Sequence, residues 1–177
     1  MTQCSEAQVQ LMLPLVSAQR REQALRYKHI FGQYCCLKSW LMLKELIGED
    51  KKEWMEQWEY NEHGRPYWVE GPYFSISHCK EGIAVAIDNQ PIGIDIEAIR
   101  HADTDLIIRT MNETEQQQIH SDRDFTRLWT QKEAVAKMNG TGIEGFEQLQ
   151  NILTGVSVKI ETAENSKYIY SIAYKQH

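Results

Sequence analysis

Two acidic residues in the middle of the chain have the spacing of metal ligands. Residues 93–97 read Gly-Ile-Asp-Ile-Glu, an alternation typical of a β-strand. Because alternate side chains of a strand share a face, Asp95 and Glu97 project together while the isoleucines face the other way. Carboxylate oxygens suit Mg²⁺, which takes few ligands from the protein and completes its shell with water and phosphate. Alone, such a pair is more often an exposed strand face, so it supplies only half of a metal site.

A second segment, residues 129–137, offers a further acid and a base. It reads Trp-Thr-Gln-Lys-Glu-Ala-Val-Ala-Lys. On a helix, Glu133 lies one turn after Trp129 and one turn before Lys137, so the three side chains share a face. An exposed acid–base pair of this kind is worth only ~0.2–0.5 kcal/mol. The neighbouring tryptophan favours a partly buried site instead, and burying charged groups without partners is costly.

The elements that position these residues can be predicted from periodicity and turn residues. Apolar residues at three- and four-residue intervals predict one long helix from about Ser17 to Ile47, ending at Gly48. Strands are predicted over Tyr73–His78, Ile83–Asp88 and Ile92–Glu97. The last two should form a hairpin through the turn at 88–91, and this hairpin would deliver Asp95 and Glu97.

The second half of the chain has clear helix-end signals. Asn112 with Glu115 has the spacing of a capping box, and Ser121 should cap the helix that carries Glu133. That helix should stop near Asn139-Gly140, because both residues favour a C-terminal cap. Two more strands are predicted, over Gly155–Thr162 and Lys167–Lys175. Earlier in the chain, Glu53–Glu62 is interpreted as a short helix passing into a strand.

Four motifs occur in one order and carry a resemblance to a known family. They are a Gly-Arg-Pro turn at 64–66, Phe-Ser-Ile-Ser-His at 74–78, Gly-Ile-Asp-Ile-Glu at 93–97 and the Trp-to-Lys segment at 129–137. Each fragment is weak alone, but the ordered set is specific. The chain resembles the surfactin-type 4′-phosphopantetheinyl transferases, which move phosphopantetheine from coenzyme A to a serine of a carrier protein. The resemblance runs from about Arg20 to the C-terminus.

This resemblance implies a fold and a separate role for each half of the chain. The expected class is α+β, with two similar halves related by a pseudo-twofold axis, mostly antiparallel strands and one long helix packed in each half. Residues 1–91 would form the N-terminal half and contact the phosphates and adenine of coenzyme A. Residues 92–177 would form the C-terminal half with the metal ligands and the catalytic helix. The cleft between the halves would hold coenzyme A and the metal.

The resemblance also implies roles for individual residues. Mg²⁺, or alternatively Mn²⁺, would be held by Asp95, Glu97 and Glu133. Glu133 would accept the serine proton, with a metal-bound water as the alternative base, and Lys137 would neutralise the leaving phosphate. The residues expected to contact coenzyme A are Arg20, Lys28, Arg65, Ser77, His78 and Lys137.

Several of these residues also have a simpler interpretation. Arg65 could be an ordinary turn residue, His78 an edge histidine, and the basic face of the first helix merely solvated. In that helix, Cys35 and Cys36 stand where the family has a basic and a hydroxyl side chain. Which basic residue compensates stays open.

Bulk composition agrees with a small cytoplasmic enzyme. The chain has 177 residues, 42% of them hydrophobic, and a net charge of -6, which disfavours nonspecific nucleic-acid binding. The apolar run at 11–16 is too short to span a membrane and lacks a basic leader. The four cysteines have no metal-ligand spacing and are expected to be reduced thiols. We therefore expect a monomer with no nucleic-acid or membrane partner.

The expected partners are coenzyme A and an apo acyl or peptidyl carrier protein. The segment Ile107–Met111 is a candidate docking surface, although apolar packing of a short helix explains it equally well. Two other functions fit part of the pattern. One is a non-catalytic module that binds coenzyme A or a carrier protein, and the other is an unrelated metal-dependent phosphohydrolase.

Overall fold

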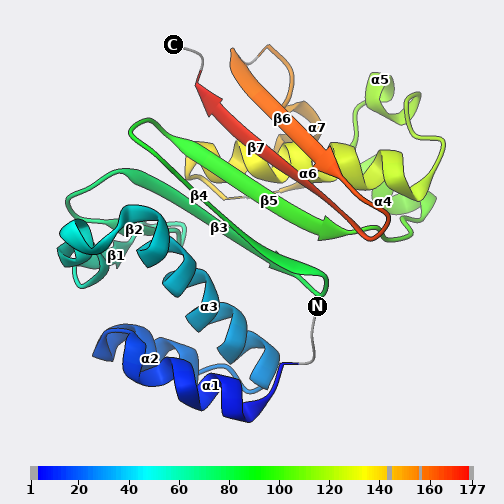
Figure 1. Ribbon diagram of the computed structural model, residues 1–177. Helices are drawn as coiled ribbons and strands as arrows, with labels where there is room; N and C mark the ends of the chain where they lie inside the picture. Colours follow the sequence, from blue (N-terminus) through cyan, green and yellow to red (C-terminus); the bar gives the residue numbers. More distant parts are fainter. Residues whose placement is uncertain (1–3, 143–144, 156, 176–177) are drawn as a thin grey trace.

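The computed structural model describes residues 4–142, 145–155 and 157–175. Five helical segments precede the strands: α1 (Glu6–Met12), η1 (Leu13–Leu15), α2 (Ala18–Leu25), α3 (Ile30–Ile47) and η2 (Glu49–Met55). Later helices are α4 (Thr104–Thr110), α5 (Glu113–Gln116), α6 (Asp122–Asn139) and α7 (Phe146–Asn151). In Figure 1, the N-terminal helices lie at one end of the molecule and α6 lies at the other, with strands between them.

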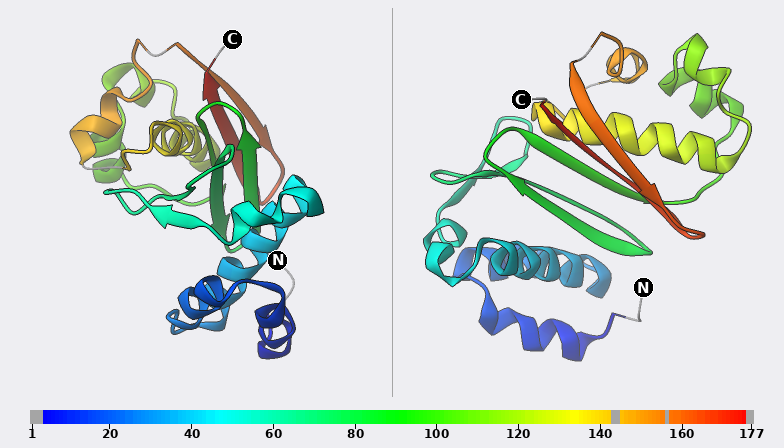
Figure 2. Two further views of the ribbon diagram at one scale, coloured as in Figure 1. Left: turned by 90° about the vertical axis from the view of Figure 1, so that its left-hand side faces the viewer. Right: turned by 45° about the horizontal axis from the view of Figure 1, so that its top comes forward.

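The strands form three antiparallel groups. β1 (Trp58–Tyr60) pairs with β2 (Pro66–Trp68), and β3 (Tyr73–Cys79) pairs with β4 (Gly82–Asp88). The third sheet has the order β5-β7-β6, built from β5 (Ile92–Ala98), β7 (Tyr168–Lys175) and β6 (Val158–Glu164). The two views of Figure 2 place α3 beside β3 and β4, and α6 beside β5 and β7. The predicted α+β class with antiparallel strands is confirmed, and the pseudo-twofold relation stays a prediction.

The prediction of one long N-terminal helix was wrong. The helix breaks at residues 26–29, and α2 folds back against α3. The break lets Ala24 of α2 pack with Val9, Met12, Cys36 and Leu37 in one buried cluster. A continuous helix would have left the apolar side of α2 without a partner. Helix α1, which begins with a Ser5–Gln8 capping box, was not predicted.

The predicted hairpin of β4 and β5 was also wrong. β5 pairs instead with β7, with Asp95 opposite Ser171. Its other side lies along β3, where Ser75 Oγ accepts a hydrogen bond from Ile94 N (3.0 Å) and Ser77 Oγ accepts one from Ile96 N (3.3 Å). The residue numbers increase along both strands from the first contact to the second, so β3 and β5 run in the same direction. Serine side chains thus satisfy amide groups that a neighbouring strand would otherwise pair.

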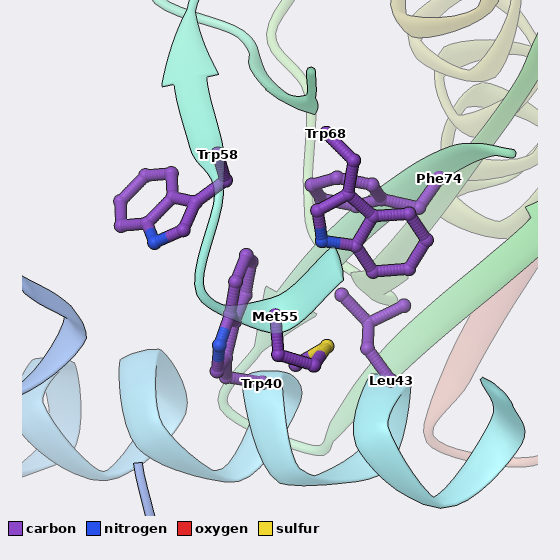
Figure 3. Packing of buried hydrophobic residues seen from close by; sticks show 6 residues of the cluster. All are labelled: Trp40, Leu43, Met55, Trp58, Trp68 and Phe74. Atoms are coloured by element: carbon purple, nitrogen blue, oxygen red, sulfur yellow. The ribbon is translucent and has the colours of Figure 1, made fainter. Parts of the chain in front are cut away.

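An aromatic core fixes α3 to the β1–β2 hairpin. Figure 3 shows Trp40 and Leu43 of α3 facing Trp58, Trp68 and Phe74. The ring centroids of Trp40 and Trp58 lie 5.1 Å apart, and those of Trp68 and Phe74 lie 4.4 Å apart. Such pairs contribute about 0.5–1.5 kcal/mol each beyond the burial of their area. The hairpin and α3 therefore share one buried aromatic cluster, which also includes Phe74 of β3.

The helix that carries Glu133 has the predicted bounds. Ser121 accepts a hydrogen bond from Asp124 N at its start, and Gly140 ends it in the left-handed conformation (φ 76°). The capping box at Asn112 is also present, although α5 is only four residues long. None of the helices in the described ranges is long and apolar enough to cross a membrane.

Candidate active site

Gly93 allows α6 to lie directly on β5. A Cβ atom at this position would come within 1.9 Å of Ala134 O and 2.4 Å of Met138 N. Backbone therefore meets backbone here, and no side chain fits between helix and strand. Asp95 and Glu97 share a strand face with Gly93, so they project toward the same helix. The spacing Gly-x-Asp-x-Glu thus brings the acidic side chains up to α6.

One ammonium group joins three elements at this place. Lys137 Nζ of α6 lies 2.6 Å from Asp95 Oδ1 of β5 and 2.9 Å from Ser77 Oγ of β3. The Ser77 hydroxyl donates to the same Asp95 oxygen at 2.7 Å. The Asp95 side chain is almost fully buried, whereas 29% of the Lys137 side chain is exposed. Lys137 therefore reaches a buried carboxylate from the cavity side.

The Asp95 charge affects the ionisation of two neighbouring glutamates. Burial and the nearby Asp95 charge raise the pKa of Glu133 to about 7. Burial and the same Asp95 charge raise the pKa of Glu97. Such coupling requires the groups to lie close together. Without a cation the site therefore holds excess negative charge, which Lys137 and Arg100 offset only in part.

The side chains present fit a hard divalent cation. Asp95 Oδ2 is buried and has no hydrogen-bond partner in the described part of the chain. A buried carboxylate oxygen without a partner is costly, and a bound cation would remove this cost. The neighbouring ligands are carboxylate oxygens, as Mg²⁺ prefers. Within the described ranges no three His, Cys, Asp or Glu side chains are grouped closely enough to hold a metal ion, and Lys137 Nζ lies 2.6 Å from Asp95 Oδ1.

These residues line a cavity of about 580 Å³ with walls from both parts of the chain. One wall comes from α2, α3 and β1, and the other comes from β3, β5 and α6. The residues that sequence predicted for the site and that the cavity brings together are Arg20, Ser77, His78, Asp95, Glu97, Glu133 and Lys137. A volume of this size matches ordinary small-molecule sites.

Arg20 is a buried cation without an acidic partner among the described residues. Its Nε and Nη2 donate to Cys36 O at 3.1 and 2.7 Å, and its Nη1 donates to Gln23 Oε1 at 2.6 Å. The guanidinium carbon lies 4.4 Å from the centre of the Trp40 ring. Burial lowers the pKa of Arg20. A buried positive charge with only neutral partners is suited to an anionic ligand.

His78 lies at the edge of the cavity. Its ring meets Phe31 edge-on at 6.0 Å. Loss of solvation and the nearby Lys137 charge lower the pKa of His78, so its imidazole is mainly neutral at neutral pH. A neutral ring can still donate one N–H to a phosphate oxygen.

Two predicted contacts lie elsewhere. Lys28 is exposed in the connection between α2 and α3 and is not part of the cavity wall. Arg65 is engaged by backbone carbonyl groups: Nη1 donates to Met138 O at 3.2 Å, and Nη2 donates to Phe74 O at 3.0 Å and Ile92 O at 3.1 Å. Arg65 is not among the residues that line the cavity of Asp95, but it lines an adjoining cavity of about 200 Å³ together with Lys137.

Several wall residues were not predicted as site residues. Gln23 Nε2 donates to the Tyr60 hydroxyl across the cavity wall, and Tyr27, Cys35 and Ser39 complete this side. Because α2 folds back on α3, residues 20–27 lie opposite residues 35–39. A single continuous helix would hold these two segments apart, so the sequence-based prediction could not bring them together in one site.

The predicted docking segment has a mixed character. Ile108 is half exposed, with 50% of its surface accessible, whereas Thr110 and Met111 are fully buried. Gln150 Nε2 also donates to Ile108 O at 2.7 Å, which ties α4 to α7. Part of the segment therefore packs in the core and part remains on the surface.

Comparison with known proteins agrees with this geometry. Residues 91–174 match the model of the 4′-phosphopantetheinyl transferase superfamily. A 4′-phosphopantetheinyl transferase of Bacillus pumilus is 30% identical over 146 residues, covering 77% of this chain and 63% of the relative. A Bacillus subtilis relative of the same name is 31% identical over 144 residues, covering 75% of this chain and 63% of the relative.

A more distant relative is the 4′-phosphopantetheinyl transferase AcpT of Salmonella typhi, which is 30% identical over 113 residues, or 58% of each chain. The chain thus spans about 63% of the length of the Bacillus relatives that it matches. The family match covers β5, α6 and β7, the elements that carry Asp95, Glu97, Glu133 and Lys137. The chain is thus similar to the 4′-phosphopantetheinyl transferase superfamily, both in the matched residues 91–174 and in the longer alignments with the Bacillus relatives.

Proposed function

We propose that this chain transfers the 4′-phosphopantetheine group from coenzyme A to a serine of an apo acyl or peptidyl carrier protein. The observation that carries the proposal is a single cavity with positive groups in both walls. Arg20, which is buried and has no acidic partner among the described residues, lies in one wall, and the Lys137–Asp95 contact lies in the other. Coenzyme A has both a 3′-phosphate and a pyrophosphate, so a ligand of this kind needs positive charge at two places. Residues 1–91 would supply the wall of α2, α3 and β1 and also Ser77 and His78 of β3, and residues 92–177 would supply the three carboxylates and Lys137.

The basic groups in the cavity would receive the phosphates. Arg20 has one Nη1–H beyond its bond to Gln23, and that hydrogen is our candidate donor to the 3′-phosphate. His78 and Lys137 would face the pyrophosphate, beside Ser77. Charge-assisted hydrogen bonds to phosphate are roughly twice as strong as neutral ones. Lys28 would act only from the surface, where solvent weakens its attraction.

Asp95, Glu97 and Glu133 would hold Mg²⁺, or alternatively Mn²⁺. When bound, the cation would offset the charge of the pyrophosphate and of the carboxylates. The unpartnered Asp95 Oδ2 supports this assignment, because it offers an acceptor that nothing described in the chain uses.

The residues of the chain would act on a single displacement at phosphorus. The serine oxygen of the carrier attacks the phosphorus that bears pantetheine, and the bond from that phosphorus to the oxygen bridging the two phosphates breaks. Adenosine 3′,5′-bisphosphate leaves with that oxygen. Glu133, whose side chain lies beside Asp95 and Glu97 in the same cavity, would accept the serine proton, with a metal-bound water as the alternative acceptor. Lys137 donates to the departing phosphate, where negative charge grows in the transition state.

The test is to incubate the protein with coenzyme A, Mg²⁺ and a panel of apo-carrier proteins. We expect the carrier mass to rise by one phosphopantetheine group, with one adenosine 3′,5′-bisphosphate released per modified serine. A carrier with its serine replaced by alanine serves as the control. Binding of coenzyme A without any mass increase would support a non-catalytic module instead. Hydrolysis of coenzyme A without a carrier would indicate a phosphohydrolase.

The same samples test the assembly that we propose. We expect the enzyme to act as a monomer in the cytoplasm, with neither nucleic acid nor membrane as a partner. Size-exclusion chromatography with light scattering on the active protein would measure the state. A dimer in the active fraction would contradict this part of the proposal.

A further inference from the structure

The turn between β1 and β2 reaches across the molecule to the end of α6. Arg65, which ends this turn, donates to Met138 O of α6 (3.2 Å), to Phe74 O of β3 (3.0 Å) and to Ile92 O of β5 (3.1 Å). A single planar guanidinium therefore joins three elements. The partners lie 73, 9 and 27 residues away in the chain.

Asn61, which begins the same turn, binds the carbonyl group of Gly140, the residue that ends α6. Its Nδ2 donates to Gly140 O at 2.8 Å. Its Oδ1 accepts from His63 N (3.0 Å) and Arg65 N (2.8 Å), so the amide also holds the turn in shape. These bonds fix the orientation of the Asn61 amide. If it were reversed, its NH₂ group would face the N–H groups of His63 and Arg65, and its oxygen would face Gly140 O.

Donors at the C-terminal end of a helix stabilise it. The last carbonyl groups of a helix have no partner within it, and the C-terminal end carries partial negative charge. Gly140 turns the chain in the left-handed conformation, and its N–H binds Ala136 O and Lys137 O. Asn61 and Arg65 thus cap α6 with donors from a distant part of the chain.

The capped position is next to the residue that matters most for the proposed chemistry. Lys137 precedes Met138, whose carbonyl binds Arg65, and Lys137 Nζ reaches Asp95 and Ser77 on β5 and β3. Arg65 binds carbonyl groups of those same two strands. The guanidinium therefore ties the backbone of Lys137's neighbour to the two strands that carry the side-chain partners of Lys137.

We propose that Asn61 and Arg65 are positioning residues that hold Lys137 in register with Asp95 and Ser77, and that Arg65 does not bind a phosphate of coenzyme A. The kinetic part of this inference rests on the proposed function. The structural part concerns only the end of α6 and can be tested without substrate.

Two conservative variants separate positioning from phosphate binding. Arg65→Lys keeps the positive charge but loses the planar fork that reaches three carbonyl groups. Asn61→Asp keeps the acceptor for His63 N and Arg65 N but places an oxygen opposite Gly140 O. Arg123→Ala is the matched control, because Arg123 also lies on α6 and donates to a backbone carbonyl (Asn165 O, 3.0 Å), at the other end of the helix.

We expect both variants to lower kcat by about 10- to 100-fold, the size of effect that follows a small misplacement of a reacting group. The KM for coenzyme A should change by less than about threefold, and the preference for coenzyme A over its dephospho form should match that of the parent. Arg123→Ala should keep parental kinetics. A raised KM in Arg65→Lys with unchanged kcat would overturn the proposal.

The substrate-free measurement is hydrogen exchange of peptides that cover residues 132–142. Both variants should exchange faster there than the parent, while peptides from β7 exchange at the parental rate. Faster exchange together with a parental kcat would mean that the contacts of Asn61 and Arg65 with the end of α6, here called the clamp, only stabilise the fold. That result would overturn the positioning role. If Arg65→Lys fails to fold, Asn61→Asp decides by the same two measurements. A parent protein that shows no transfer would defeat the proposed function, whereas unchanged exchange in both variants would defeat the clamp.

Discussion

The Lys137 ammonium and the Asp95 carboxylate lie 2.6 Å apart, although 42 residues separate them in the chain. Their contact joins α6 to β5, and Ser77 extends it to β3. Because one partner is buried and the other opens onto the cavity, the pair links the core of the protein to its ligand site. Breaking a buried pair by removing one partner is usually more damaging than exchanging both.

Removing the ammonium should separate binding from chemistry. In Lys137→Ala the carboxylates remain, so Mg²⁺ and coenzyme A should still bind. The single-turnover transfer rate should fall by about 100-fold or more, because charge on the leaving phosphate is no longer offset. Transfer to an apo-carrier across a Mg²⁺ titration is the measurement. Full rescue by extra Mg²⁺ would mean that Lys137 only stabilises Asp95.

Neutralising either strand carboxylate should abolish transfer. Asp95→Asn and Glu97→Gln preserve shape but remove a negative ligand from the proposed metal site. Circular dichroism should show a folded protein in both cases, and isothermal titration should show weaker Mg²⁺ binding. Near-parental turnover in either variant would exclude that residue from the site.

Glu133→Gln should combine both losses. It removes a ligand and the proposed proton acceptor without changing the shape of the side chain, so kcat and the apparent Mg²⁺ affinity should fall together. Initial rates at several Mg²⁺ concentrations measure both. A loss of Mg²⁺ affinity with a parental kcat at saturating Mg²⁺ would assign the proton to another acceptor.

Arg20 should discriminate between coenzyme A and its dephospho form. Arg20→Gln removes a charge-assisted bond of about 1.5–3 kcal/mol, so KM for coenzyme A should rise roughly 10- to 100-fold. KM for dephospho-coenzyme A should change much less. The control is Arg21→Gln, since Arg21 is the exposed neighbour and donates to Leu13 O. An equal rise in KM for coenzyme A and for dephospho-coenzyme A would mean that Arg20 does not bind the 3′-phosphate.

Stability above pH 9 should depend on Cys35. Burial raises the pKa of this thiol from 9.0 to about 12, so between these values the folded protein keeps a proton that the unfolded chain releases. The free energy of unfolding should therefore fall as pH rises above 9, by up to about 1.4 kcal/mol per pH unit from this group. Urea unfolding at pH 8, 9 and 10 should show a shallower fall in Cys35→Ala. Parallel curves for the two proteins would contradict the assignment.

Local patterns predicted β3, β4, β5 and β7 to within one residue at each end, and they also predicted the helix that carries Glu133. Ser121 and Gly140 bound α6 because capping depends on a few adjacent residues. The alternation in 93–97 correctly put Asp95 and Glu97 on one face, and both line the cavity with Glu133 and Lys137. These features depend on spacing within one element, which the sequence displays directly.

The parts that were mispredicted depend on contacts between distant segments. The break at 26–29 keeps the apolar period nearly in phase, so periodicity alone could not reveal that α2 folds back on α3. Arg65 was assigned to a phosphate because its turn matched a family motif, and that assignment stays a prediction. What the sequence did not reveal is its bonds to three backbone carbonyl groups, because every residue has a carbonyl group and residue types therefore do not indicate such contacts.

The hydroxyl of Ser77 has no remaining capacity for a further hydrogen bond. A serine hydroxyl offers one hydrogen and two lone pairs. The hydrogen goes to Asp95, and the lone pairs receive Ile96 N–H and Lys137 N–H. A phosphate oxygen accepts hydrogen bonds, so it could bind Ser77 only by taking the hydrogen that Asp95 now accepts. The Lys137 ammonium has three N–H groups and gives two of them to Asp95 and Ser77, so the third remains for a phosphate oxygen while both existing bonds stay in place.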